Sequence, residues 1–232
     1  MYYGKTNKTL FNYMYRKMLS NSNFNFHLMF FILFVNCFLP SINLAASTTH
    51  QEPKNKPDSL EKKISSMLTA ATNQVGVTTT YNAAYQKIKY PMGDVPIHEG
   101  VCTDVIIRAM RAIGIDLQKE VHDSMRLNRA VYLKKWGVCA LDTNIDHRRV
   151  PNLVTFFKLK GMEVAGIDKK YQAGDIVVWD LETGQYHIGI LSDKKTPDNK
   201  SFLVIHNISC GVKIEDILNS YSIVAHFRLL RR

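Results

Sequence analysis

Between residues 58 and 161, apolar side chains recur every three or four positions, which is the spacing of one face of an α-helix. Four such stretches occur: from Asp58 or Ser59 to Gly76, from Thr103 to Gly114, over Val121–Trp136, and from Asn152 to Gly161. The residues at their ends suit helix termini: a polar cap, Pro151 before the last stretch, and glycine after three of the four. We therefore predict four helices, with an ordered loop over Thr78–Gly100 between the first two.

After Gly174 the pattern changes from helical to alternating. Four runs are rich in β-branched and aromatic residues: Ile176–Trp179, Tyr186–Leu191, Phe202–Asn207 and Ile223–Leu230. Turn-forming stretches separate them, so we predict neighbouring antiparallel strands. Helices followed by strands indicate an α+β fold, with the helix that begins near Thr103 covering one face of the sheet.

The N-terminal region has a different character. Residues 28–39 are almost wholly apolar and follow a basic stretch without acids, and small residues follow at Ala45, Ala46 and Ser47. This pattern predicts a secretory signal over residues 1–46, with an uncleaved anchor as the less favoured alternative because twelve residues are too few for a span. Residues 47–58 are polar and proline-bearing and predict a flexible lead-in, so the folded domain is expected over 59–232.

Charge narrows the choice of partner. The 232 residues carry a formal net charge of +10, and outside residues 1–46 the chain has 26 bases and 20 acids, a net charge of +6. Such a surface suits nucleic acid or anionic envelope polymers. No nucleic-acid motif and no phosphate-binding glycine loop is recognisable. We expect an envelope partner such as peptidoglycan, no nucleic acid, and membrane contact only through the signal.

Cleavage near Ala46 would leave three cysteines: Cys102, Cys139 and Cys210. An oxidising compartment favours pairing, and a Cys139–Cys210 disulfide would leave Cys102 free. The alternative is that Cys139 and Cys210 are both small buried apolar residues. The sequence leaves this choice open.

Cys102 lies at the predicted start of a helix, where unpaired N–H groups and the helix dipole favour a thiolate. A histidine beside it could take the thiol proton. Strand alternation puts His187 and Gly189 on one face of their strand, and His206 on the matching face of the next, with Asn207 on the other side. We therefore predict Cys102 as nucleophile, His187 as base and His206 as the residue that orients it.

Other polar residues allow two interpretations each. Asp104 can cap the helix start or bind a substrate amine. Arg148 or Arg149 could hold a substrate carboxylate, or Asp146 could pair with one of them to fix a loop. Cys102, His187 and His206 could supply zinc ligands if they converge, but no Cys-x-x-Cys or His-x-x-x-His pair supports a metal site, so no metal and no cofactor are expected.

Several segments resemble a known family. Gly174–Trp179 is similar to the Gly-Asp strand entry of NlpC/P60-like proteins, a division of the papain-like cysteine peptidases, and His187–Ile190 is similar to their His-x-Gly-Ile core. The order Cys102, His187, His206 also matches. More closely, Tyr90–Pro96, Gly100–Val105, Asn144–Asn152 and Val204–Ile208 resemble the DUF1287 (YijF-like) proteins. One departure is Val101-Cys102-Thr103-Asp104, where the best-known NlpC/P60 enzymes have Asp-Cys-Ser-Gly.

The resemblance implies an NlpC/P60-like papain fold and an exported cysteine-dependent amidase or peptidase that cleaves an amide in peptidoglycan peptides. An acyltransferase or lipid-directed amidase is an alternative, although such relatives tend to place histidine before cysteine. A non-catalytic envelope-binding protein on the same fold is a further alternative.

Overall fold

The computed structural model describes residues 59–136, 140–165 and 170–229. The predicted signal and lead-in, and Cys139, lie outside these residues. No helix in the described ranges is long and apolar enough to cross a membrane.

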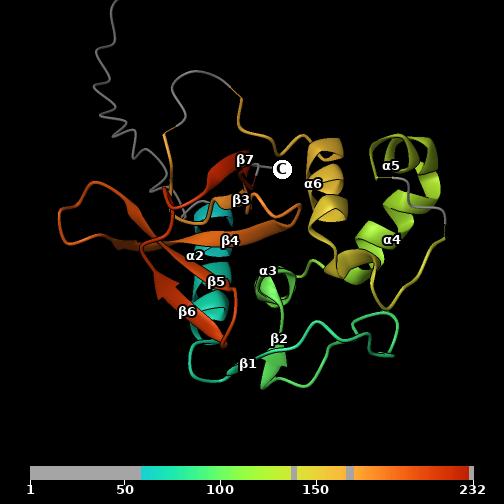
Figure 1. The fold of residues 1–232 in the computed structure, drawn as a ribbon, viewed down its shortest axis with the longest axis horizontal. Helices are drawn as coiled ribbons and strands as arrows, with labels where there is room; N and C mark the ends of the chain where they lie inside the picture. Colours follow the sequence, from blue (N-terminus) through green and yellow to red (C-terminus); the bar gives the residue numbers. More distant parts are fainter. Residues whose placement is uncertain (1–58, 137–139, 166–169, 230–232) are drawn as a thin grey trace, which may run out of the picture. The chain divides into compact units, whose positions relative to one another are not determined.

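Five α-helices and one short 3-10 helix form the described helical part (Figure 1). They are α2 (Ser59–Thr72), α3 (Cys102–Arg111), α4 (Leu117–Leu127), α5 (Arg129–Trp136), η1 (Asp146–Arg148) and α6 (Val150–Leu159). The prediction of one helix over Val121–Trp136 was wrong, because Asn128 leaves the helical conformation and its side chain donates to the Ser124 carbonyl at 3.0 Å. That local bond ends α4, and α5 then begins in a new direction.

A five-stranded antiparallel sheet follows the helices along the chain. Its strands are β3 (Ile176–Asp180), β4 (Tyr186–Lys195), β5 (Phe202–Asn207), β6 (Val212–Glu215) and β7 (Ser222–Phe227), in the order β6-β5-β4-β3-β7. The α+β prediction is confirmed, and so are the four predicted strands. The sequence missed β6, and it missed two short strands that pair in parallel within the predicted loop, β1 (Thr80–Tyr81) and β2 (Glu99–Gly100).

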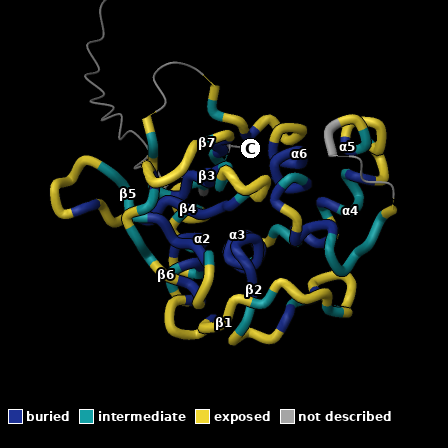
Figure 2. Tube along the Cα trace, in the orientation of Figure 1, coloured by how far each residue is buried: buried dark blue, intermediate teal, exposed yellow. Residues whose placement is uncertain are grey.

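The two faces of the sheet carry separate apolar clusters. Side chains of α2, α3 and α6 pack on the face that presents Ile188, Ile190 and Ile205. Helix α3 is buried along almost its whole length (Figure 2), which fits its central place in this core. The opposite face presents a smaller cluster built on Trp179, Leu191 and Val204.

A buried ionic cluster ties β7 to the start of β3. Asp175 accepts hydrogen bonds from His226 Nε2 at 2.6 Å and from Arg228 Nε at 2.7 Å. Burial acts against the charged form of Asp175, but the bonds from Arg228 and His226 outweigh it and lower the pKa of the carboxyl. The Gly-Asp pair at residues 174–175 therefore has a structural role, in which Gly174 takes a positive φ of 87° and Asp175 joins two strands.

Candidate functional site

Hydrogen bonds from three directions fix the start of α3. Val101 has no side-chain acceptor, and its own N–H donates to Asp104 Oδ2 at 2.6 Å, so Asp104 caps the helix. Thr103 Oγ1 donates to the Arg148 carbonyl at 3.1 Å. Asn207 Nδ2 donates to the Gly100 carbonyl at 3.1 Å, which ties β5 to the segment just before Cys102.

The Cys102 thiol lies on the α3 side of the sheet, against the backbone of Ile188 in β4. The predicted contact with the His187 side chain is not found among the described residues, because the His187 ring is on the other face of the sheet with Trp179. The backbone of Ile188, the residue after His187, hydrogen-bonds to the sulfur, as do the backbone groups of Thr103 and Cys102 itself. Burial is nevertheless the largest influence, because only 6% of Cys102 is exposed, and it raises the pKa of the thiol to about 12. The helix start does favour a thiolate, as the sequence indicated, but desolvation is the stronger effect.

His187 and His206 form the pair that strand alternation predicted. His187 Nε2 and His206 Nδ1 are 3.0 Å apart, and both side chains are at most 2% exposed. The His187 ring also stacks on Trp179, the residue that pairs with it on the neighbouring strand β3, and the ring centroids are 5.7 Å apart. Gly189 makes the close approach possible, because a Cβ there would lie 3.3 Å from the His206 Cβ and 2.6 Å from Val204 Cγ1.

A third side chain extends the pair into a chain of hydrogen bonds. Glu215 Oε2 lies 3.1 Å from His206 Nε2, and a carboxylate can only accept, so that nitrogen carries the proton. In a neutral His206, Nδ1 is then an acceptor, and His187 Nε2 must donate to it. The network assigns the lone pair of His187 to Nδ1.

Both imidazoles are held neutral. Burial lowers the pKa of His187 to about 3, and the neighbouring His206 adds to the effect. Burial also lowers the pKa of His206, although Glu215 acts in the opposite direction. The resting site therefore holds a neutral thiol and a neutral base rather than a standing ion pair.

A cavity of about 440 Å³ gives access to this thiol. Four segments line it: Tyr81 and Ala83 around β1, Val101 and Cys102, Ile145 with Arg148 to Pro151 before and at the start of α6, and Gly184 to Tyr186 in the turn before β4. Two other hollows of similar volume, about 460 and 420 Å³, contain none of the predicted site residues. The buried sulfur thus has a route for a ligand.

The two adjacent arginines have different environments. Arg148 is buried and binds Asp104 through Nε at 3.0 Å and Nη2 at 2.9 Å. The pairing of Asp146 with an arginine, given above as one alternative, is not the one found: Asp146 instead contacts His122 Nδ1 at 3.1 Å. Arg149 is exposed and lines the cavity. Asp104 and Arg148 are therefore placed as a structural ion pair, and Arg149 is left facing the site.

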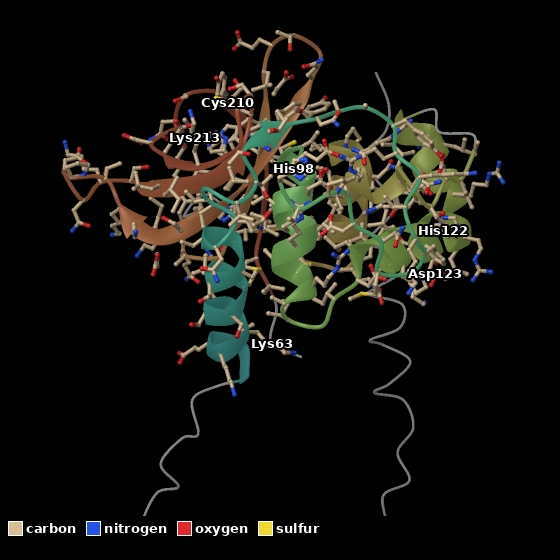
Figure 3. All side chains as sticks on the ribbon, turned by 90° about the horizontal axis from the view of Figure 1, so that it is seen from below. Lys63, His98, His122, Asp123, Cys210 and Lys213 are labelled. Atoms are coloured by element: carbon tan, nitrogen blue, oxygen red, sulfur yellow. The ribbon has the colours of Figure 1, made fainter. Side chains whose placement is uncertain are left out.

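The prediction that Cys210 is a buried apolar residue was wrong. Cys210 is exposed and free, because it lies in the turn between β5 and β6. Hydrogen bonds from Ser209 and Lys213 lower the pKa of its thiol. Figure 3 shows Cys210 and Lys213 close together at the surface of the sheet.

The sequence missed three residues at the site. Tyr81 lines the cavity; partial burial raises the pKa of its hydroxyl, and the neighbouring Cys102 and Asp104 add to the rise. Asn207 anchors the segment before the thiol, and Glu215 completes the histidine chain. Glu215 could have been noticed in the sequence as an acid in the short run Val212–Glu215, which contains β-branched residues.

Metal ligation has no support in the described ranges, where no group of three or more histidine, cysteine or acidic side chains is arranged to hold an ion.

Comparisons with known proteins show the family of this chain. The family model described as domain of unknown function DUF1287 matches residues 68–229. The chain is also 48% identical over 160 residues to a protein named uncharacterized protein YijF from Escherichia coli (strain K12), an alignment that covers 68% of this chain and 78% of that protein. The matched region includes Cys102, the histidine pair, Glu215 and the cavity. The chain belongs to the DUF1287 family.

Proposed function

We propose that this protein is an exported cysteine-dependent amidase or peptidase that hydrolyses an amide bond in peptidoglycan peptides. The observation that carries the proposal is the thiol of Cys102 at the mouth of a cavity, against the peptide that follows His187. A cavity with an activatable nucleophile is the usual form of such a site.

The proposed catalytic cycle requires the His187 ring to move to the thiol, because the hydrogen-bond chain of Glu215, His206 and His187 does not include Cys102. His187 Nδ1 takes the proton of the Cys102 thiol as the sulfur bonds to the amide carbon, and backbone N–H groups of Cys102 and Thr103 stabilise the oxyanion. His187 then gives that proton to the leaving amine nitrogen, and the C–N bond breaks. Water, deprotonated by His187, attacks the thioester and releases a carboxylic acid and the free thiol.

The high pKa of the thiol sets when activation takes place. A thiol with a pKa of about 12 does not ionise at rest when its base has a pKa of about 3. Proton transfer must accompany bond formation, so the bound substrate has to exclude water and stabilise the developing charge. We expect low reactivity toward small reagents and higher reactivity toward the true substrate.

An NlpC/P60-like papain fold is part of this proposal. Its support is the helix that begins at the nucleophile, the antiparallel sheet beside it, and the order Cys102, His187, His206. Export and a wall substrate are supported by the predicted signal over residues 1–46 and by the basic charge of the remaining chain.

Digestion of whole sacculi tests the proposal. Protein purified from a host that exports it should release new amines and muropeptides, detected by mass spectrometry. Cys102→Ala should release none, and Cys210→Ala, which removes an exposed thiol outside the cavity, should match wild type. Identical digests from wild type and Cys102→Ala over a broad panel of peptidoglycan types would exclude this activity.

A non-catalytic envelope-binding role is the second candidate, and the raised pKa of Cys102 is the observation that favours it. Acid-quenching a reaction with peptidoglycan fragments separates the two candidates. An acyl adduct on the peptide that contains Cys102 supports hydrolysis. Retention of wild type and Cys102→Ala alike on sacculi, with no adduct, supports the binding role.

A further inference from the structure

The position of Arg149 makes the cavity beside Cys102 asymmetric in charge. Its backbone is held in place by its neighbour, because Arg148 is bound to Asp104 and its carbonyl accepts from Thr103. The Arg149 side chain is exposed at the cavity, and within the described ranges it has no hydrogen-bond or ion-pair partner. An arginine on a fixed backbone with an uncommitted guanidinium is available to a ligand.

No acid offsets this charge inside the cavity. None of the described residues that line it is aspartate or glutamate, and the other lining cation, Arg148, is neutralised by Asp104. The charge of Arg149 acts on the pKa of an acid, Asp142, which does not line the cavity. Burial raises the pKa of Asp142, but hydrogen bonds from Asn144 and Tyr85 and the charge of Arg149 lower it overall. The bonds to Asn144 and Tyr85 already occupy that carboxylate.

We infer that the cavity selects an amide substrate that carries a carboxylate near the scissile bond, and that Arg149 binds this carboxylate. The guanidinium fork matches a carboxylate with two parallel N–H···O bonds. Val150, the first residue of α6, also lines the cavity, so the positive end of that helix adds to the attraction. This inference rests on the proposed function only in taking Cys102 as the residue that meets the substrate.

Charge selection can be measured without knowing the substrate. Iodoacetate and iodoacetamide alkylate a thiol by the same displacement of iodide and differ in charge. The rate of each at Cys102 is followed by peptide-resolved mass spectrometry on the full chain, which separates Cys102 from Cys210, and the iodoacetate-to-iodoacetamide ratio is compared with that of N-acetylcysteine. Because His187 is neutral at pH 7, a preference for the anion would report Arg149 rather than an imidazolium.

The ratio at Cys102 should exceed that of N-acetylcysteine, and Arg149→Gln should reduce it by roughly three- to fivefold. Arg149→Lys should keep part of the preference, since it retains the charge and loses the fork. Arg126→Gln is the matched control, because Arg126 is an exposed arginine on α4 outside the cavity, and it should leave the ratio unchanged. Equal ratios in wild type and Arg149→Gln would overturn the inference, even in a protein that digests peptidoglycan.

If the buried thiol reacts with neither reagent, direct binding replaces the rate measurement. Amide spectra of the Cys102→Ala protein are recorded during titration with glutarate and, separately, with its neutral diamide. Glutarate should shift the backbone amides of Val150 and Thr103, and Arg149→Gln should abolish the shifts. Equal shifts with the two compounds, or none with either, would contradict the inference without bearing on hydrolysis itself.

Discussion

Two buried histidine clusters lie on the same sheet and differ in what surrounds them. His226 bonds Asp175 and contacts Tyr171 with the two rings tilted and their centroids 4.9 Å apart. His187 bonds His206 and stacks on Trp179. In each cluster the histidine is at most 2% exposed and uses Nε2 for its bond. Burial and a hydrogen bond therefore do not distinguish a catalytic histidine from a structural one.

The neighbours make the distinction. Around Asp175 the donors converge on one carboxylate, which Gln172, His226 and Arg228 all contact, while the other ring nitrogen of His226 is buried without a hydrogen-bond partner in the part of the chain that the structure describes. Beside His187 lies the peptide that touches a thiol, and that thiol lines a cavity. A titratable group becomes a candidate for chemistry when a reactive partner and space for a ligand adjoin it.

Matched asparagine substitutions should separate the two clusters most sharply. His187→Asn should lower hydrolysis of peptidoglycan by roughly 10²- to 10⁴-fold, because it removes the proton acceptor. His226→Asn should leave turnover per folded molecule unchanged and lower the free energy of unfolding by about 2 kcal/mol, because a buried carboxylate loses a donor. Turnover on sacculi and denaturant unfolding measure the two effects.

The comparison would fail if the effects were exchanged. A His226→Asn protein that is fully folded but inactive would give the Asp175 cluster a catalytic role. An active His187→Asn protein would remove the base from the mechanism.

Acid should affect the two clusters in different pH ranges. Burial lowers the folded-state pKa of His187 to about 3, from 6.5, so the unfolded chain binds a proton that the folded protein does not. Stability therefore falls as the pH falls below 6.5, by about 2 kcal/mol from this group between pH 6.5 and 4.5. The lowered pKa of Asp175 acts with the same sign, but only near and below the carboxyl's ordinary 3.8.

Denaturant unfolding at several pH values tests this difference. Between pH 6.5 and 4.5, His187→Asn should lose about 2 kcal/mol less stability than wild type. His147, whose pKa burial lowers to about 4, is present in both proteins, so its contribution cancels. Parallel curves over this range would mean that the His187 ring is not held neutral by burial.

The sequence predicted those parts of the fold that local periodicity encodes. The stripe on Val105, Ile106 and Met110 gave α3, and the alternating runs gave the four longer strands. The short strands β1, β2 and β6 depend on pairing between segments far apart or on a turn, and two to four residues carry no periodic signal. Asn128 ends α4 through a side-chain bond, which helical spacing does not encode.

The same limit explains the site. Adjacent strands of matching period were enough to predict that His187 and His206 meet. Glu215 was not predictable, because its place beside His206 requires the register in which His206 faces Lys213 on β6. The thiol pKa depends on how much protein covers the sulfur, and a sequence position at a helix start contains no information on that burial.

The smallest of the expected effects concerns Glu215, which bonds His206 rather than the candidate base His187, whereas Asp175 bonds His226 directly. Glu215→Leu removes the acceptor that fixes the His206 proton on Nε2. The proton can then occupy His206 Nδ1 and be donated to His187 Nε2, which moves the lone pair of His187 from Nδ1 to Nε2. One hydrogen bond of about 1 kcal/mol corresponds to a roughly fivefold to tenfold loss of turnover. Glu215→Gln keeps a carbonyl acceptor and should stay within about twofold of wild type.

Lys213→Gln is the control for charge, since Lys213 Nζ lies 3.7 Å from Glu215 Oε1 and its charge helps to lower the pKa of His206. The ring-nitrogen chemical shifts of His187 and His206 read the proton positions directly. In Glu215→Leu they should show a mixture of protonation at Nδ1 and Nε2, while Glu215→Gln and Lys213→Gln keep the wild-type pattern. If leucine and glutamine at position 215 behave alike in both turnover and shifts, burial and Trp179 alone orient the pair, and the two histidine clusters then differ only in the thiol and the cavity.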